Sequence, residues 1–444
     1  MKTNSDEMHN QEMLLKKIRQ SSEVFDKLAN SYEVWVPESG LLAGRRNRDK
    51  NDSKRKNLTD WSILSFLLEI DNCHYPMADS YLQYGIDGVI RIAAETLETL
   101  KNNLQSELQD QTQLDIAYLE SLLHVWKRFR QFVADHMVLA LECAKQETSD
   151  TKKKCYEKIA KICQNLTINK PNTFCEALQL FWFTYLFRSP FGAGCIGRLD
   201  QLLYPFYKHD CEMGIWDQQE AEKMLEEMFT RMNEINTGDT LRNLMLSGQD
   251  AKGNDQTNEI TYLILVAYEN TGGSEPHLNV RFHEKTPKKL RDNCINMLSS
   301  GSGQPTIYFD EAVLPAMEKA GICHEDACQY ANDGCTETVI AGKSAIVFWQ
   351  YEMVKTVELT LFGGNENPCV KPVSMKKNSI HGADFVPKTN LLIGIESKKP
   401  QELTTFSEFL SAFFEQMDHQ LDHYFLMIKQ KMQEETEAQI TTQG

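Results

Sequence analysis

Apolar residues in the first half of the chain recur every three or four positions, which is the spacing of the buried side of a helix. The clearest stripe consists of Leu114, Ala117, Tyr118, Leu122, Val125, Trp126 and Phe129. This period predicts a largely helical region over 61–168 and further helices over 174–187, 217–236 and 407–435. We expect a charged break at Lys152–Lys154 and a turn at Asn169–Asn172, where Pro171 stands between two asparagines.

The period changes after about residue 240. Short runs that are mostly apolar or β-branched predict strands over 244–247, 278–282 and 306–309. Helical spacing returns between and after them, over 258–268, 287–298, 311–319 and 324–330. Strands that alternate with helices favour an α/β fold with a partly enclosed sheet. Residues 189–194, by contrast, contain proline and glycine and are expected to interrupt regular structure.

Residues 1–60 are polar and strongly charged, and we predict a partly flexible arm there, followed by one domain over 61–444. The basic stretch 44–57 (GRRNRDKNDSKRKN) could be a phosphate or nucleic-acid patch, but a solvated loop fits the rest of the chain better. The whole chain has 47 Lys and Arg against 63 Asp and Glu, a net charge of −16. Such a balance argues against binding to nucleic acid or to anionic membrane.

The sequence contains no stretch near the ~20 apolar residues of a membrane helix, and its first residues do not resemble a signal peptide. A cytoplasmic location is therefore expected. None of the 12 cysteines forms a CxxC pair, so we expect reduced thiols and neither a zinc site nor any other bound metal.

One cysteine lies in a segment suited to chemistry, NDGCTE at 332–337. If Cys335 and Glu337 are extended, their side chains point to the same side, and Gly334 permits a close turn before them. A neighbouring carboxylate raises the pKa of a thiol and disfavours the thiolate, so this pair suits hydrogen-atom transfer better than ionic attack. The alternatives are a buried cysteine beside a surface glutamate, and a two-electron cysteine enzyme.

Several segments resemble motifs of the glycyl radical enzymes related to pyruvate formate-lyase, in the order of that family. They are TFCEALQLFWF at 173–183, GRLDQ at 197–201 with YPFY at 204–207, the stretch 243–258, PHLNVR at 276–281, GQPTIYFD at 303–310 and GCTE at 334–337. The resemblance extends over about residues 80–430. It departs from the family at Ser247, which stands in place of a glycine, and in GQPTIYFD, which lacks an asparagine.

The resemblance implies a helical N-terminal layer followed by about half of a ten-stranded α/β barrel. It assigns Cys335 to a thiyl radical that abstracts hydrogen from a small-molecule substrate, and Glu337 to the general base. His277 is a candidate for lining the substrate cavity. Gly334 is expected to shape the loop, and Arg198 and Asp200 to order it as a buried ion pair.

Two departures bear on the reaction. The family's glycyl motif, Arg-Val-x-Gly-Tyr, is absent from the sequence, so the half barrel is expected to receive its radical from another chain or from a missing continuation. The expected partner is a second polypeptide that carries the glycyl loop, or else a homo-oligomer. A radical S-adenosylmethionine activase would install the radical, and no cofactor is expected in this chain. The two adjacent cysteines of pyruvate formate-lyase are also missing. A radical dehydratase or decarboxylase is therefore favoured over a formate C-acetyltransferase-like protein, and a non-catalytic remnant that acts as an interaction module stays open.

Residues 192–195 differ as well, because many eliminating members carry a Gly-His pair where this chain has Gly-Ala-Gly-Cys. The usual polar contact to substrate is therefore missing, and the substrate is not specified by the resemblance.

Overall fold

The computed structural model describes residues 15, 16, 18, 26, 33–45, 78–103, 109–188, 194–234, 242–334, 337–341, 343–344, 353–365, 394–398 and 400–443. The basic stretch after residue 45, the break at 189–193 and Cys335 lie outside these residues. Contacts divide the chain into two units, residues 1–109 with 116–346 and residues 110–115 with 347–444. None of the helices in the described ranges is both long and apolar enough to cross a membrane.

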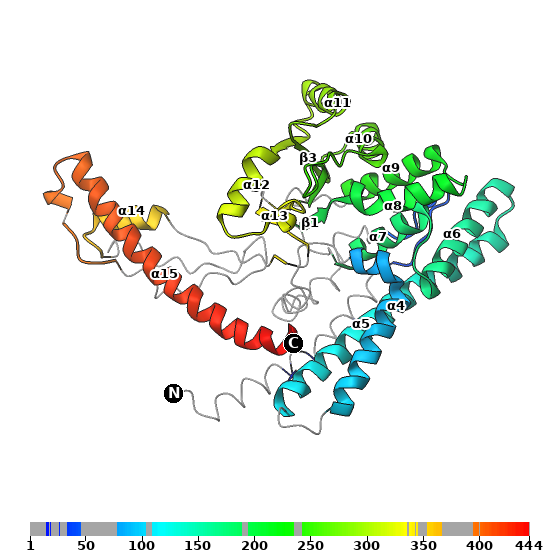
Figure 1. The fold of residues 1–444 in the computed structure, drawn as a ribbon, viewed down its shortest axis with the longest axis horizontal. Coiled ribbons are helices and arrows are strands. Elements are labelled where there is room, and N and C mark those ends of the chain that lie inside the picture. The colour runs from blue at the N-terminus through cyan, green and yellow to red at the C-terminus, as the bar shows by residue number, and fades with distance from the viewer. Residues whose placement is uncertain are drawn as a thin grey trace. The chain divides into compact units, whose positions relative to one another are not determined.

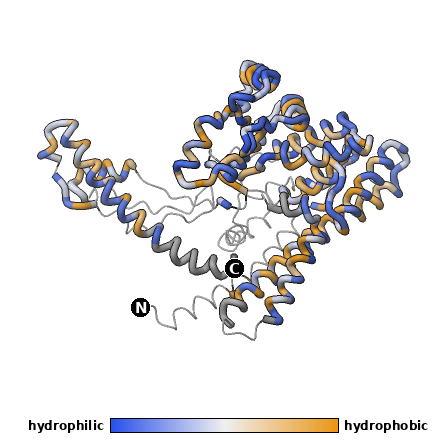
Figure 2. Tube along the Cα trace, in the orientation of Figure 1, coloured by the Kyte–Doolittle hydropathy of each residue, from blue (hydrophilic) through white to orange (hydrophobic). Residues whose placement is uncertain are grey.

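The first unit begins with long helices (Figure 1). They are α4 (Ala78–Asn103), α5 (Gln109–Gln146), α6 (Asp150–Ile168) and α7 (Phe174–Arg188). The stripe predicted on α5 is confirmed, since Leu114, Trp126 and Phe129 are buried, and hydrophobic and hydrophilic positions alternate along this helix (Figure 2). The predicted break at Lys152–Lys154 is wrong. These lysines are exposed on the first turns of α6, where charge does not interrupt a helix whose apolar side is buried.

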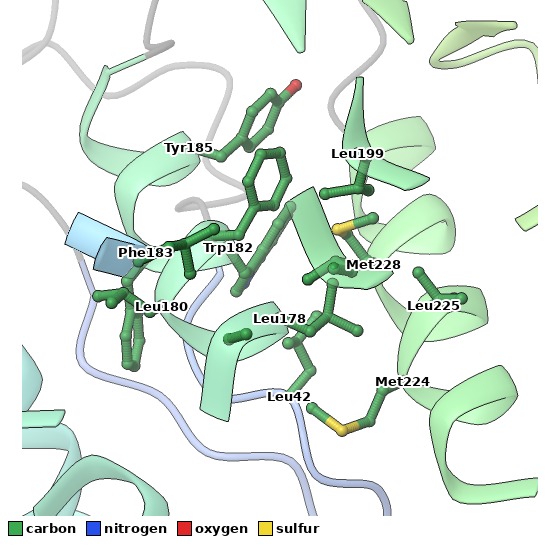
Figure 3. Packing of buried hydrophobic residues seen from close by; sticks show 14 of the residues in the cluster. Leu42, Leu178, Leu180, Trp182, Phe183, Tyr185, Leu199, Met224, Leu225 and Met228 are labelled. Carbon is green, nitrogen blue, oxygen red and sulfur yellow. The ribbon is translucent and has the colours of Figure 1, made fainter. Parts of the chain in front are cut away.

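Helix α7 lies at the centre of the main hydrophobic core. Its residues Leu178, Trp182 and Phe183 are fully buried, and they pack with residues of α8 (Leu199–Glu212) and α9 (Gln218–Glu234) (Figure 3). Helix α9 confirms the helix predicted over 217–236, and its Met224, Met228 and Met232 are at most 1% exposed. Helix α8 was not predicted, because Pro205 lies inside it.

A parallel four-stranded sheet follows, in the order β1-β2-β3-β4. The strands are β1 (Gly194–Gly197), β2 (Arg242–Ser247), β3 (His277–Phe282) and β4 (Thr306–Phe309). Strands β2, β3 and β4 confirm the predicted strands. Strand β1 was not predicted, and it begins at Gly194, the last residue of the segment expected to be irregular. In register, Asn243 pairs with His277 and Ser247 with Arg281, so the carboxyl ends of the strands lie together at one edge.

The two faces of the sheet pack against different elements. Leu244, Leu246 and Val280 belong to the main core and contact the helical side, which includes α10 (Glu259–Thr271) and α11 (Lys288–Ser299). Side chains alternate along a strand, so Cys195 and Met245 point to the other face. There they join a second apolar cluster. This cluster contains residues of α12 (Asp310–Lys319), α13 (His324–Ala327) and the hairpin of β5 (Ala331–Asp333) and β6 (Glu337–Val339). We call this second side the inner face. The predicted α/β class is confirmed.

Residues 33–45 have no regular structure but are bound to the helices through their backbone. Gln179 of α7 accepts a hydrogen bond from the amide of Ala43 (2.7 Å) and donates one to its carbonyl (3.0 Å). The indole of Trp182 donates to the carbonyl of Gly44 (2.9 Å), and Glu227 accepts from the amide of Leu42 (3.0 Å). Buried backbone groups need such partners, so the side chains replace the hydrogen bonds of a helix or sheet.

The second unit contains α14 (Met353–Leu361), a short 3-10 helix (Pro400–Glu402) and α15 (Phe406–Gln443). The long C-terminal helix predicted over 407–435 is confirmed. Its buried Gln416 binds both backbone groups of Ile395, at 2.6 and 3.1 Å, and its Gln420 accepts a hydrogen bond from Thr356 of α14 (3.0 Å). Buried polar contacts therefore join α15 both to α14 and to the segment around Ile395.

His136 makes the stability of the first unit depend on pH. The imidazole is fully buried, with Nδ1 2.8 Å from the carbonyl of Phe132 and Nε2 3.3 Å from the amide of Trp35. Burial lowers the pKa of His136 from 6.5 to about 4, so the ring is neutral and Nε2 accepts the hydrogen bond. The imidazole binds a proton more readily in the unfolded chain than in the folded one. Protonation therefore favours unfolding, and the free energy of unfolding decreases as the pH falls from 6.5 towards 4.

Between pH 7 and pH 5, we expect the free energy of unfolding of the wild-type chain to fall by about 2 kcal/mol more than that of His136→Asn, which has no imidazole to protonate. Urea titrations at the two pH values measure this difference. An equal loss in both proteins would contradict it.

Candidate active site

A buried ion pair joins the carboxyl ends of β3 and β4. Arg281 donates from Nε to Asp310 Oδ1 (2.8 Å) and from Nη2 to Asp310 Oδ2 (2.9 Å), and both side chains are fully buried. Arg281 Nη1 donates to the carbonyls of Cys328 (2.9 Å) and Tyr330 (3.3 Å), and the hydroxyl of Tyr330 donates to Asp310 (3.0 Å). Residues 328–330 were predicted to continue α13. They leave the helix instead, and their carbonyls bind the arginine.

Arg198 and Asp200 hold the neighbouring strand end. Arg198 donates to the carbonyl of Ser247 (2.8 Å), whereas Asp200 accepts from the amide of Ser247 (2.8 Å) and the hydroxyl of Thr261 (2.7 Å). Burial raises the pKa of Asp200, and the charge of Arg198 opposes that rise. Arg198 also donates to the carbonyl of Cys328 (3.3 Å). The predicted direct ion pair between Arg198 and Asp200 is not among the contacts of these described residues. Both side chains instead order the end of β2 by binding the backbone of Ser247.

Ser247 adopts a backbone conformation that suits glycine, with a φ of 62°. This explains the glycine in the corresponding family motif, since the left-handed region costs other residues about 1–2 kcal/mol. Here the serine hydroxyl lies 2.7 Å from that of Thr257, and its backbone is held by Arg198 and Asp200. The departure from the motif is thus accommodated by side-chain contacts.

The candidate loop connects β5 to β6. These strands are antiparallel, and Asp333 pairs with Glu337 across the connection 334–336. Gly334 is buried and has a φ of 38°, as expected for a close turn. Cys335 lies outside the described residues, so its predicted orientation stays a prediction. Glu337 begins β6 and is half-buried, on the same side of its strand as Val339, which belongs to the inner-face cluster.

Two asparagines connect the sheet to this loop. Asn243 of β2 donates from Nδ2 to the carbonyl of Gly334 (2.6 Å). Asn279 of β3 donates to Oδ1 of Asn243 (2.7 Å). The residue directly before Cys335 is therefore bound to the inner face of the sheet.

The inner face of β3 and β4 has polar residues near the loop. His277 is half-buried at the start of β3, and burial lowers the pKa of its imidazole. Burial also raises the pKa of Tyr308 on β4, an effect that its hydrogen bond with Asn332 opposes and the charge of Glu337 reinforces. Tyr308 therefore lies within electrostatic reach of Glu337, whereas His277 lies at the other end of β3, opposite Asn243. Each side chain can exchange hydrogen bonds with a neutral polar group.

Cys195 stands at the inner face of β1 and is buried among apolar residues. Cys195 is the last residue of the segment 192–195, in which the family's Gly-His pair is missing. A thiol packed among apolar side chains therefore occupies this part of the inner face. Among the described residues, no group of three His, Cys, Asp or Glu side chains could hold a metal ion.

Comparison with known proteins agrees with this arrangement. The family model described as pyruvate formate lyase-like matches residues 72–440. The chain belongs to this family of glycyl radical enzymes. The resemblance drawn from the sequence motifs is therefore confirmed, and the family model covers most of the chain.

Among the relatives is trans-4-hydroxy-L-proline dehydratase from Clostridioides difficile, which is 31% identical over 301 residues. That match covers 64% of this chain and 36% of the relative. Isethionate sulfite-lyase from Oleidesulfovibrio alaskensis is 28% identical over 333 residues, or 70% of this chain and 37% of that protein. The chain thus spans about a third of the length of these relatives.

A solved structure shares the fold. The B12-independent glycerol dehydratase from Clostridium butyricum matches with a TM-score of 0.71 at 22% identity, over 92% of this chain and 58% of that one. The parallel sheet and its helices therefore correspond to part of the fold of a glycyl radical enzyme. The half barrel and the boundary at residue 61 remain predictions.

The site's framework includes residues to which sequence analysis gave no role: Asn243, Asn279, Arg281, Asp310 and Tyr330. The first four lie in the motif segments that carried the resemblance, and that was the signal available. Their contacts join residues up to 91 positions apart, which the motifs alone do not reveal.

Gly248 gives a test of the buried ion pair. A Cβ at this position, where φ is +99°, would lie 2.5 Å from Nε and 2.6 Å from Cζ of Arg281. We expect Gly248→Ala to lower the free energy of unfolding by about 3–5 kcal/mol, because it displaces a buried charge from its partner. Chemical denaturation measures the loss.

Gly253→Ala is the matched control. Gly253 also has a positive φ, +71°, but its nearest neighbours would lie 3.8 Å from a Cβ. It should lose about 1–2 kcal/mol, from backbone strain alone. Equal losses in the two variants would show that Arg281 is not displaced.

Proposed function

We propose that this chain is the thiyl-bearing part of a glycyl radical lyase that eliminates a group from a small polar organic substrate. A dehydratase or decarboxylase type of cleavage is favoured. Cys335 is the hydrogen-abstracting residue, and Glu337 is the general base. The observation that supports this proposal most directly is the β5–β6 hairpin. Asp333 pairs with Glu337 in this hairpin, so the proposed base stands at the end of the connection that contains Cys335.

The proposed chemistry for a substrate with a hydroxyl group balances as follows. The Cys335 sulfur radical takes a hydrogen atom from a substrate carbon, which forms an S–H bond and leaves a carbon radical. Glu337 accepts the hydroxyl proton from that radical, and the neighbouring leaving group departs with its bonding electron pair. The product radical then takes the hydrogen atom back from the Cys335 thiol. Such proton transfer contributes about 10²–10⁴ to a rate.

The radical reaches Cys335 from outside these 444 residues in this proposal, because the sequence has no Arg-Val-x-Gly-Tyr motif. A glycyl radical supplied by a second polypeptide, or by a continuation of this chain beyond the 444 residues, would remove the hydrogen atom from the Cys335 thiol. A radical S-adenosylmethionine activase would install it. The relatives support an elimination, since two of them are named as a dehydratase and a sulfite-lyase.

Substrate contacts are proposed on the β3–β4 side of the inner face. His277 is uncharged at neutral pH because burial lowers its pKa, so it suits a neutral hydroxyl or amide group of the substrate. Cys195 and Met245 are packed in the apolar cluster on the β1–β2 side. We therefore propose that polar groups of the substrate contact His277 at the start of β3 or Tyr308 on β4.

The test uses the chain reconstituted anaerobically with a glycyl-radical-bearing partner and its activase. We expect Cys335→Ser to abolish turnover, because an alcohol cannot replace the thiol as a hydrogen-atom donor. Glu337→Gln should lower kcat by about 10²-fold or more, because the amide cannot accept the proton. Product formation and the glycyl radical signal in electron paramagnetic resonance are the measurements.

Matched controls are Cys323→Ser and Glu325→Gln, which alter an exposed thiol and an exposed carboxylate on and before α13. They should retain activity within about twofold, as surface changes usually do. Turnover by Cys335→Ser at the wild-type rate would refute the assignment.

A further inference from the structure

We infer that Asn243 and Asn279 form an amide relay that fixes the turn at Gly334, and that both are positioning residues for the loop that contains Cys335. The catalytic meaning of this inference rests on the proposed function. The relay itself is a property of the folded chain, and it can be examined without radical chemistry.

The relay runs between two backbone carbonyls. Asn279 donates from Nδ2 to Oδ1 of Asn243 (2.7 Å) and also lies 3.3 Å from the carbonyl of His277. Asn243 donates from its own Nδ2 to the carbonyl of Gly334 (2.6 Å). Both amides are nearly inaccessible, with Asn243 3% and Asn279 2% exposed. Water therefore does not readily replace either contact.

The chemistry at the two ends sets the direction of every amide in the relay. A carbonyl only accepts hydrogen bonds, so Asn243 must present its NH₂ group to Gly334 and its oxygen to Asn279. Asn279 must then present its NH₂ group to Asn243. A change at Asn279 is therefore transmitted to Gly334, although Asn279 and Gly334 share no contact in the relay.

The strand pairing gives the relay a fixed base. Asn243 lies opposite His277 in the β2–β3 register, and Asn279 is two residues further along β3 on the same face. The hairpin of β5 and β6 carries only three residue pairs, so its own hydrogen bonds hold the turn weakly. The anchor from Asn243 supplies the external constraint that a catalytic loop needs to hold its geometry.

Asn279→Asp tests the direction of the relay. The carboxylate only accepts, so the Asn243 amide must turn to donate to it, and its oxygen then faces the carbonyl of Gly334. We expect Cys335 to be alkylated about tenfold faster by iodoacetamide, and the 331–341 peptide to exchange amide hydrogens about tenfold faster. Peptide mass spectrometry reads both rates in the isolated full chain.

Asn279→Ala removes the NH₂ group that donates to Asn243 and adds no charge. If Asn279→Asp does not fold, this variant provides the test of the relay. It should raise the Cys335 alkylation rate about threefold, because the Asn243 amide keeps a partner at Gly334 but is no longer oriented. A rate within 1.5-fold of wild type in folded Asn279→Ala would overturn the relay.

Asn233→Ala is the control for general loss of stability. The Asn233 amide donates to a loop carbonyl, that of Glu275, at 2.7 Å, and none of its hydrogen bonds reaches Gly334 or Glu337, the described residues at the two ends of the candidate loop. It should lower the melting temperature much as Asn279→Ala does and leave Cys335 alkylation unchanged. If Cys335 in Asn233→Ala were alkylated as fast as in Asn279→Ala, the faster reaction would result from lower stability, and the proposal would be overturned.

Turnover in the reconstituted assembly separates this proposal from the proposed function. Asn279→Ala should lower kcat about threefold or more with little change in KM, because the loop is displaced while the substrate contacts remain. If wild-type protein shows no turnover but alkylation responds as expected, the lyase proposal fails and the relay stands. If wild type turns over and Asn279→Ala matches it in kcat, the relay is refuted.

Discussion

The Arg281–Asp310 pair is the contact on which the candidate site depends. Burying two charges costs several kcal/mol each, and the cost is offset only when the geometry is good and the remaining donors and acceptors are satisfied. Here the two side chains bind in parallel, and the other donors of Arg281 reach the carbonyls of Cys328 and Tyr330. One buried charge thus links two strand ends to the segment that leads into the β5–β6 hairpin.

Buried amide side chains hold irregular backbone at three places in the described part of the chain. Gln179 binds both backbone groups of Ala43, Gln416 binds those of Ile395, and Asn243 binds the carbonyl of Gly334. Each is a buried amide side chain that satisfies backbone groups which no helix or strand can satisfy. Hydrogen abstraction requires the reacting atoms to be held within a narrow range of distances, so rigid loops are what such chemistry needs.

The sequence predicted the elements whose pattern is strong and missed those whose local signal is weak. Strands β2 to β4 are apolar or β-branched runs, whereas β1 contains two glycines among four residues, which disfavour a strand. Helix α8 was hidden by Pro205, and α6 begins in a lysine run whose charges face solvent. Cys335, Glu337 and Gly334 were singled out from local chemistry and motif together. Asn243 and Asn279 were not, because their role comes from contacts between segments far apart in the chain.

The departure at residues 192–195 and the polarity of the inner face have a common explanation. With Cys195 packed against Met245 in the apolar cluster, the β1–β2 side supports the hairpin. The polar side chains lie on β3 and β4, where the charge of Glu337 helps to raise the pKa of Tyr308. A base that takes a proton from a substrate hydroxyl must lie beside the groups that orient that hydroxyl. In the proposed reaction, Tyr308 on the sheet and the carboxylate of Glu337 meet this requirement from two separate elements. Absence of the Gly-His pair then alters the contacts that a substrate finds beside β1 and leaves the proposed base in place.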